Sequence, residues 1–324
     1  MPTPGHGSAP AGTAVIALGG NALSPAGERS TIFDQFRHTR SSLGPVVDLA
    51  LDGWKLCLVH GNGPQVGDEL VRNERASAEV APLPLGVLVA ATAGWIGYMV
   101  QQSLENALRR AGSDRAVATV VTQVEVAADD PALRAPVKFI GHEVTAEHAR
   151  ALAAQGATMK QDSRGRWRRV VPSPTPLAVH EIGVIAELVK RGTIVVACGG
   201  GGAPVYRDPA LGLEGVDAVV DKDLAAAVLA RGLDASLLLI LTDVDAVYLD
   251  YGKPAQRALD RLHVDEAERL DRTGAFGAGS MAPKVRAAVD FVRRTGGRAI
   301  ITELRRGREA VRGMAGTTIT MEQA

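Results

Sequence analysis

The chain has 324 residues, and its 36 lysines and arginines balance 36 aspartates and glutamates, so the formal net charge is zero. This balance leaves no overall field to draw the chain to nucleic acid or an anionic membrane. Hydrophobic residues make up 46% and charged residues 22%, which excludes a disordered chain, and 4% aromatics are too few for base-stacking platforms. The length fits one large α/β domain or two lobes that share a sheet.

Short apolar runs alternate with helical patterns along the chain, which predicts a layered α/β fold with a mainly parallel sheet. Strands are predicted, in chain order, at 14–18, 55–60, 115–122, 193–198, 236–242 and 298–302. Helices are predicted at 45–52, 85–111, 180–191, 222–231 and 281–295. Segment 124–176 breaks this rhythm and is expected to leave the sheet as a small subdomain or lid.

Residues 1–12 have neither a basic region nor an apolar stretch, so we interpret them as a disordered tail rather than a signal peptide. Cys57 and Cys198 each lie in an apolar run typical of a buried strand. Two buried thiols favour a reducing, cytoplasmic setting over a disulfide framework or a zinc site.

The stretch 80–104 contains no charged residue and is long enough to span a bilayer. Pro82, Pro84 and the polar pair Gln101 and Gln102 argue against a membrane span, and no basic cluster flanks the stretch. We therefore expect a buried helix at a core or subunit interface, with a membrane span as the alternative.

Three predicted strands end in glycine-rich loops, at 17–24, 59–67 and 197–205. The carboxyl ends of parallel strands line a ligand crevice, and glycine lets backbone N–H groups approach an anion. Three such loops predict a phosphorylated ligand, although tight turns alone are the alternative. The chain lacks the P-loop pattern G-x-x-x-x-G-K-[ST], and GNGPQVG lacks the acidic partner of a dinucleotide fingerprint.

Three lysines lie in settings that suit phosphoryl transfer, which needs cations where negative charge spreads over phosphoryl oxygens. Lys222 is flanked by Asp221 and Asp223 at the predicted start of a helix. Lys284 lies near the start of another helix, after a glycine-rich segment, and Lys138 lies within 124–176. Taken singly, each of these lysines is expected to be solvated at the surface. Their sequence settings instead favour a role beside the phosphate groups of a ligand.

A series of sequence blocks runs in a fixed order from about residue 14 to the C-terminus. In chain order they are VIALGGNAL, VHGNGPQVG, GWIGYMVQQ, VKFIG, ACGGGGAPV, VVDKDLAAAVLA, LTDVDAVYLDYGKP and GSMAPKVRAAVDFV. In these blocks the chain resembles the carbamate kinases of the amino-acid kinase superfamily. The resemblance implies a three-layer α/β/α open, mainly parallel sheet. It also implies an N-lobe at 13–215 for the phosphoryl acceptor, including a protruding subdomain at 124–176, and a nucleotide-binding C-lobe at 216–324.

The same resemblance implies a phosphotransferase with a carboxyl-type acceptor, which interconverts ATP plus carbamate and ADP plus carbamoyl phosphate. It implies a homodimer, with Mg²⁺ held mainly by the nucleotide phosphates and water rather than by protein ligands. No nucleic acid or membrane partner is expected.

The resemblance also implies roles for individual residues, at the positions of this chain that match the motifs of the family. For phosphoryl transfer the resemblance implies Lys138, Lys222, Asp223 and Lys284. For the phosphoryl group and carbamate it implies Gly19, Gly20, Asn21, Gly61, Asn62 and Gly63. For the nucleotide it implies Gly200, Gly201, Asp221, Asp243, Tyr248 and Met281.

The chain departs from its relatives at some positions. Many relatives carry a lysine on the first strand, where this chain has Ala17 and Leu18, so Lys138 is the expected substitute cation. Thr92-Ala93-Gly94 stands where many relatives read SQG, and Val137 and Phe139 flank Lys138 where they read PTKPIG. No general base is evident, and none is needed because carbamate is already an anion.

Alternatives remain open. The chain could phosphorylate another small anion, or it could be a nucleotide-sensing module without catalysis. His142 and His148 lack the spacing of a zinc motif, and the arginine-rich run 164–169 is interpreted as a solvated face or a lid contact rather than an RNA site. His60 is expected to be a hydrogen-bonded loop histidine.

Overall fold

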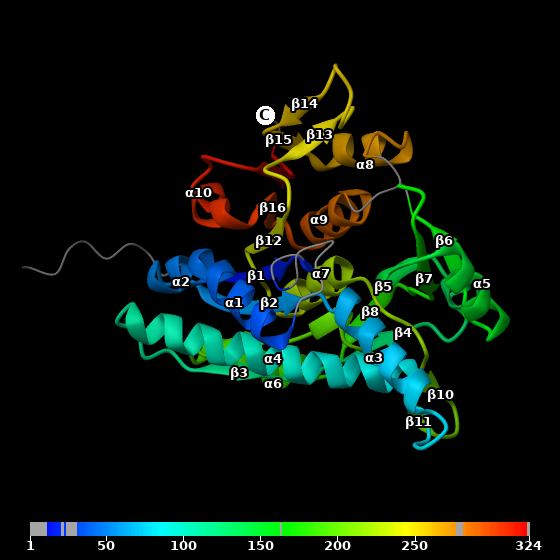
Figure 1. Cartoon of the computed structure of the whole chain (residues 1–324). Helices are drawn as coiled ribbons and strands as arrows, with labels where there is room; N and C mark the ends of the chain where they lie inside the picture. Colours follow the sequence, from blue (N-terminus) through cyan, green and yellow to red (C-terminus); the bar gives the residue numbers. More distant parts are fainter. Residues whose placement is uncertain (1–11, 21–22, 24–30, 163, 277–280, 323–324) are drawn as a thin grey trace, which may run out of the picture.

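A computed structural model describes residues 12–20, 23, 31–162, 164–276 and 281–322, and is built around one eight-stranded sheet (Figure 1). Its strand order is β15-β17-β16-β12-β1-β2-β9-β3, and every neighbouring pair is parallel except β16–β17. The strands are β1 (Thr13–Leu18), β2 (Lys55–His60), β3 (Val117–Thr119), β9 (Ile194–Val196), β12 (Leu237–Thr242), β15 (Arg261–His263), β16 (Arg298–Glu303) and β17 (Thr317–Thr320). The predicted mainly parallel sheet is therefore confirmed.

Helices cover both faces of this sheet, because alternate strand residues belong to two different hydrophobic clusters. One cluster joins the strands to α6 (Ile182–Lys190), α7 (Lys222–Gly232), α8 (Val264–Arg272) and α9 (Met281–Thr295). The other joins them to α1 (Ile32–Ser42), α2 (Gly44–Leu51), α4 (Leu85–Arg110) and α10 (Gly307–Val311). The result is the expected three-layer α/β/α arrangement.

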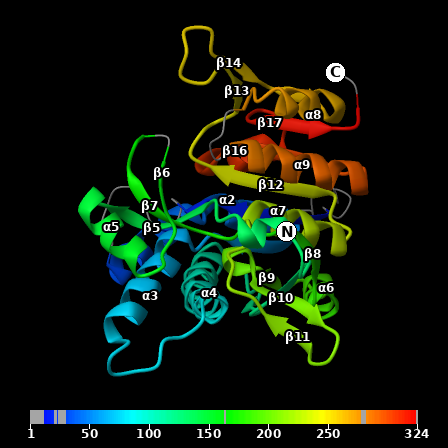
Figure 2. The same cartoon turned by 90° about the vertical axis from the view of Figure 1, so that its right-hand side faces the viewer.

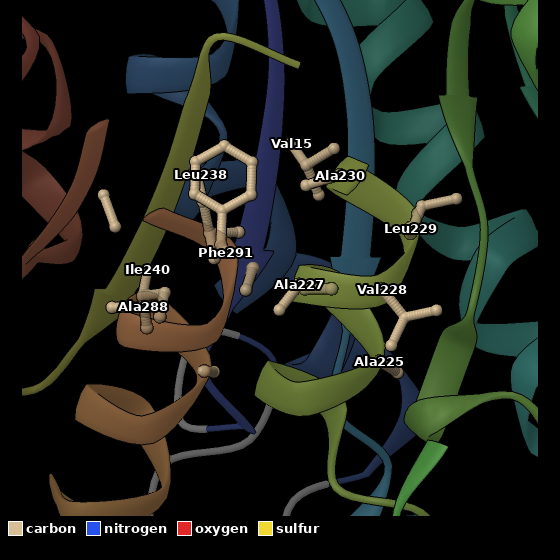
Figure 3. Packing of buried hydrophobic residues seen from close by; sticks show 14 of the residues in the cluster. Val15, Ala225, Ala227, Val228, Leu229, Ala230, Leu238, Ile240, Ala288 and Phe291 are labelled. Carbon is tan, nitrogen blue, oxygen red and sulfur yellow. The ribbon is translucent and has the colours of Figure 1, made fainter. Parts of the chain in front are cut away.

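The first cluster fixes the two helices that carry Lys222 and Lys284. Figure 3 shows Phe291 and Ala288 of α9 against β12, and Ala230 of α7 beside Val15 of β1. Ala225, Ala226, Ala227 and Ala230 are each at most 1% exposed. Small side chains let α7 approach the sheet closely, so its first turn lies beside the carboxyl ends of β1 and β2.

The segment predicted to leave the sheet contains a separate three-stranded sheet, β5-β7-β6, with one helix packed on it (Figure 2). Its elements are β5 (Lys138–Val144), α5 (Ala146–Ala154), β6 (Met159–Gln161) and β7 (Trp167–Val171). We call residues 137–171 the subdomain. The outer parts of 124–176 differ from it: β4 (Gln123–Val126) and β8 (Pro176–Val179) pair in a four-stranded sheet with β10 (Ala203–Asp208) and β11 (Gly212–Gly215).

The subdomain packs on α3 (Gly63–Ala76). At the centre of the contact, the backbones of Gly67 and Gly141 lie so close that a Cβ on Gly67 would overlap Gly141. Arg169 of β7 pairs with Glu74 of α3 at 2.6 Å. This part of the arginine-rich run is therefore an internal contact between the subdomain and α3.

The remaining elements connect these layers. They are the hairpin of β13 (Val247–Leu249) and β14 (Arg257–Leu259), and the short 3-10 turns η2 (Pro131–Arg134), η3 (Gly199–Gly201) and η4 (Leu304–Arg306). The charge-free stretch 80–104 forms most of α4, whose face toward the sheet is buried. Among the helices of the described residues, none is long and apolar enough to cross a membrane.

The two cysteines are both fully buried. Cys57 lies in β2 as predicted, whereas Cys198 lies beyond the end of β9 with a left-handed φ of 49°. The expectation of a strand at Cys198 is wrong because the chain already turns there into the glycine loop. Residues 1–11 of the predicted tail lie outside the described residues.

Candidate functional site

The site lies at the carboxyl ends of the central strands, where the order of the sheet reverses. β2 and β9 lie on one side of β1, and β12 and β16 lie on the other. A crevice forms at such a switch point. Here the Gly19 N–H donates to the Leu241 carbonyl at 3.0 Å, and a hollow of about 190 Å³ lies beside this contact. It is lined by Gly19, Leu241, Thr242, Asp243, Glu303, Leu304 and Arg305.

The first two glycine loops meet beside the first residue of α7, Lys222. A Cβ on Gly61 would lie 3.4 Å from Cδ of Lys222 and 3.5 Å from Cα of Gly20. The loop after β1, the loop after β2 and the stem of a lysine are therefore in contact. Gly61 leads into α3, whose first turn holds Pro64, so the free N–H groups of that helix end lie at the same place. Asn21 lies outside the described residues.

The third glycine loop packs against the second. Gly200 has a φ of 66°, and a Cβ there would overlap the side chain of Asn62. The Asn62 amide donates to Oγ1 of Thr92 on α4 at 2.9 Å. Asn62 is 2% exposed and Thr92 is fully buried, so the second glycine loop is anchored to α4.

Asp223 lies between the two lysines predicted on helix starts. Its Oδ1 accepts from Nζ of Lys222 at 2.5 Å, and its Oδ2 accepts from Nζ of Lys284 at 3.1 Å. Asp223 is 2% exposed and Lys284 is 7% exposed, so neither group can turn freely to solvent. One carboxylate thus fixes two ammonium groups from α7 and α9.

Asp221 connects α7 with the subdomain. Its Oδ1 accepts from the N–H groups of Asp223 and Leu224 and caps the helix, at 2.9 and 3.4 Å. Its Oδ2 accepts from Nζ of Lys138 on β5 at 2.7 Å. The two aspartates therefore bring together all three predicted lysines, from three separate elements.

The charges of the cluster shift each other's pKa values. Burial alone would raise the pKa of Asp221, but the ammonium groups of Lys138 and Lys222 outweigh it and hold that pKa well below its usual range. Burial lowers the pKa of Lys222, and the charge of Lys284 lowers it further, while Asp223 opposes both. Asp223 is thus the carboxylate that favours the charged form of Lys222.

The other residues predicted for the nucleotide are more widely placed. Asp243 lines the hollow beside Gly19. The Tyr248 hydroxyl on β13 donates to Asp245 at 2.7 Å, and Met281 begins α9 and packs against the first core cluster. A Cβ on Gly201 would overlap the Val220 backbone just before Asp221, so this loop lies against the start of α7.

Sequence reasoning did not assign three of these residues to the site, and it noted Thr92 only as a departure from relatives. Thr92 holds Asn62, and a threonine inside an apolar, charge-free helix was the available signal. Glu303 and Arg305 line the hollow at the carboxyl end of β16, and the rule that such strand ends face ligands could have found them.

Within the described part of the chain, no three His, Cys, Asp or Glu side chains form a group that could hold a metal ion. His142 pairs instead with Asp68 of α3 at 3.2 Å. Asp221 and Asp223 accept from lysines. Three ammonium groups therefore converge on these two carboxylates.

Comparison with known proteins places this geometry in a family. The family model described as "Amino acid kinase family" matches residues 12–303. The carbamate kinase of Thermococcus kodakarensis is 43% identical over 312 residues, which cover 95% of this chain and 99% of that protein. Among solved structures, the carbamate kinase from Giardia lamblia bound to citric acid has a TM-score of 0.91 at 38% identity, and covers 96% of this chain and 98% of that one. The same enzyme bound to AMP-PNP has a TM-score of 0.87 at 39% identity, with coverages of 96% and 98%. The chain therefore belongs to the amino acid kinase family, and it resembles the carbamate kinases of that family along their whole length.

Proposed function

We propose that this chain is a carbamate kinase that transfers a phosphoryl group reversibly between ATP and carbamate, giving ADP and carbamoyl phosphate. Its similarity to proteins named carbamate kinase extends over 95% of the chain in the Thermococcus relative. The single structural observation that supports the chemistry is the convergence of Lys138, Lys222 and Lys284 on Asp221 and Asp223.

The fixed lysines supply what phosphoryl transfer needs most. Negative charge spreads over the phosphoryl oxygens in the transition state, and cations held in place stabilise it without having to reorganise. Asp223 holds Lys222 and Lys284 by opposite oxygens, so their separation is set before the substrate arrives. We assign both ammonium groups to the phosphates.

Lys138 is proposed to act on the phosphoryl group from the subdomain. The first strand offers only Ala17 and Leu18, both buried, where many relatives carry a lysine. Lys138 and Asp221 are each about a fifth exposed, at 23% and 22%, so the pair lies at the boundary with solvent. Its position lets Lys138 exchange Asp221 for a substrate anion.

The acceptor is proposed to lie at Gly61, Asn62 and Gly63, with the transferring group at Gly19, Gly20 and Asn21. Carbamate is an anion whose oxygen attacks without losing a proton, so the reaction needs no general base. We propose that Gly200, Gly201, Asp221, Asp243, Tyr248 and Met281 serve the nucleotide side. The division into lobes near residue 215 and a cytoplasmic setting complete the proposal.

Mg²⁺ is expected to accompany the nucleotide. The described residues do not fit a protein-bound magnesium site, because the two carboxylates at the centre of the lysine cluster already bond ammonium groups. The nucleotide phosphates and water are the ligands we propose, and no step is assigned to the ion.

We also propose a homodimer, formed through the outer face of α4. Val87 and Tyr98 on α4 and Val121 after β3 are 46%, 56% and 50% exposed. A Cβ on Gly94 of α4 would lie 4.0 Å from Cγ2 of Val121, so the exposed face of α4 adjoins the segment that follows the edge strand β3. An edge strand beside an apolar helix face suits an isologous contact with a second copy.

The dimer is tested by light scattering or sedimentation of the full chain. Val87→Glu combined with Tyr98→Glu should give a monomer, because two charges would be buried in the contact. Val184→Glu on α6, where Val184 is 62% exposed, is the matched control and should leave the dimer intact. A wild-type chain that sediments as a monomer, or a double variant that stays dimeric, contradicts this arrangement.

The activity itself is tested by coupled measurement of ATP formed from carbamoyl phosphate and ADP. Wild-type protein should turn over carbamoyl phosphate far faster than acetyl phosphate. Lys222→Ala prepared in parallel controls for contaminating kinases. Equal ATP formation by wild type and Lys222→Ala, or preference for another acyl phosphate, would overturn the assignment.

A further inference from the structure

His60 is a buried titratable group that the proposed reaction does not use. It is the last residue of β2, is 1% exposed, and pairs with Leu18 of β1 in the sheet. Its Nδ1 lies 3.0 Å from the carbonyl oxygen of Gly61, the next residue. The imidazole therefore bonds the first peptide of the acceptor loop.

The other side of the ring is enclosed by two further elements. A Cβ on Gly199 would lie 2.5 Å from Nε2 of His60 and 3.0 Å from Cβ of Ala93, so the ring lies where η3 and α4 meet. Nε2 has no partner in hydrogen-bond geometry among the described residues. His60 thus contacts the second glycine loop, the third glycine loop and α4 at once.

The ring is neutral in this position. Burial lowers the pKa of His60 to about 4, the charge of Lys222 lowers it too, and backbone groups of Gly61 and Ala93 offset this only partly. A neutral imidazole carries one N–H, and a carbonyl can only accept. The contact of Nδ1 with Gly61 has hydrogen-bond geometry and Nε2 has no such contact among the described residues, so we place the proton on Nδ1.

Holding the Gly61 carbonyl also fixes the next amide. The carbonyl of Gly61 and the N–H of Asn62 belong to one trans peptide plane and point in opposite directions. With the carbonyl bound to His60, the Asn62 N–H is turned away from the buried ring. Asn62 is the N-cap of α3, at the helix end whose N–H groups lack helical partners.

We propose that His60 is a positioning residue that sets the direction of the Asn62 N–H toward an anionic acceptor, by donating from Nδ1 to the Gly61 carbonyl. This inference rests on the proposed function. Asn62 is held twice, through its side chain by Thr92 and through its peptide by His60. The paired restraint orients one amide donor, because a small acceptor offers few contacts of its own.

The test compares three substitutions in the full chain. Asn places an N–H₂ near the position of Nδ1, Gln extends its amide toward the position of Nε2, and Leu removes the donor but keeps the bulk. Steady-state kinetics for carbamoyl phosphate and for ADP, with thermal unfolding of each variant, are the readouts.

His60→Leu should lower kcat/KM for carbamoyl phosphate by about 10-fold to 100-fold, with the KM for ADP changed less than about twofold. His60→Asn should recover most of this loss, and His60→Gln should not. The Asn and Gln variants decide the matter even if the Leu variant does not fold, because both retain a polar amide.

If the wild-type chain turns over carbamoyl phosphate and His60→Leu does so equally well, this inference is overturned but the proposed function stands. The inference is also overturned if His60→Asn and His60→Gln lose kcat/KM equally, or if the losses of kcat/KM follow the losses of thermal stability and ADP affinity. Either pattern is expected of a histidine with a purely structural role. A wild-type chain without turnover from carbamoyl phosphate removes the proposed function, and this inference with it.

Discussion

Lys138 of the subdomain and Asp221 at the start of α7 form an ion pair with an N–O distance of 2.7 Å. The same aspartate caps the helix that begins with Lys222. An anion that draws Lys138 away from Asp221 would therefore act on the junction between the subdomain and α7. Through this pair, the subdomain and the start of α7 can influence one another.

Replacing Lys138 tests this junction. Lys138→Ala should lower kcat strongly and leave the KM for ADP nearly unchanged, because the lysine acts on the transferring group. Asp221→Asn keeps a helix-capping side chain but removes its charge. In a double-mutant cycle the two changes should be non-additive, since each removes the same pair. Full kcat in Lys138→Ala, or lost ADP affinity with kcat intact, contradicts this role.

Removing the whole subdomain is a second test of whether turnover depends on Lys138 while ADP binding does not. Val137 and Val171 are joined by a backbone hydrogen bond of 3.1 Å, so a short linker can replace residues 137–171. The four-stranded sheet keeps β4 and β8 in such a protein. Calorimetry should still detect ADP binding, whereas turnover should disappear.

Lys222 and Lys284 should matter for rate more than for folding. Lys222→Ala and Lys284→Ala should each lower kcat by about 10²–10³, typical for removal of one group that stabilises transition-state charge. Asp223 keeps one lysine partner in either variant. Lys253→Ala is the matched control, because that lysine is 68% exposed and pairs only on the surface with Asp250. Near-wild-type turnover in either site variant would exclude the assignment.

Gly200 should tolerate no side chain. Gly200→Ala adds a Cβ at a φ of 66° and displaces Asn62 from Thr92, so the KM for carbamoyl phosphate should rise. Gly112→Ala is the control, since it has a φ of 78° with nothing within 4 Å of its Cβ. Both variants carry backbone strain, but only the first should change acceptor kinetics. Equal kinetics in the two would show that the Asn62 contact is irrelevant.

Stability should fall on mild acidification because of His60. The pKa is about 4 in the folded chain and 6.5 for a free histidine, so between these values the unfolded chain binds more protons. The free energy of unfolding should therefore decrease as pH falls from about 6.5 to 4, by at most about 3 kcal/mol from this group. His60→Leu should flatten this part of the denaturation profile. His148→Gln, on the exposed side of α5, is the matched control for loss of a histidine.

The thiols should be dispensable. Burial raises the pKa of Cys57 to about 12, and it also raises that of Cys198, so neither supplies a thiolate near neutral pH. Turnover of the Cys57→Ala, Cys198→Ala double variant should match wild type per folded molecule. Some stability should be lost, because both side chains are fully buried. A folded but inactive double variant would show a thiol role.

Local patterns predicted most of the elements around the site. The short, continuous apolar run before Gly19 and the alanine-rich segment after Lys222 are typical of a buried strand and a helix, and the structure places β1 and α7 there. Predictions failed where the chain changes direction. The strand expected at 115–122 is only Val117–Thr119, and Cys198 lies in the turn, because glycine loops and hairpins depend on what packs against them.

The sequence by itself determined which residues carry charge and where backbone can approach an anion: three lysines, the Asp-Lys-Asp triplet and three glycine loops. Only the tertiary structure decided that β12 lies beside β1, that Asp223 bonds Lys284 from 61 residues away, and that Asp221 faces Lys138 across 83. The physical reason is range. Periodicity and turn chemistry act over a few residues, whereas strand order and ion pairing follow from the burial of two complete hydrophobic clusters.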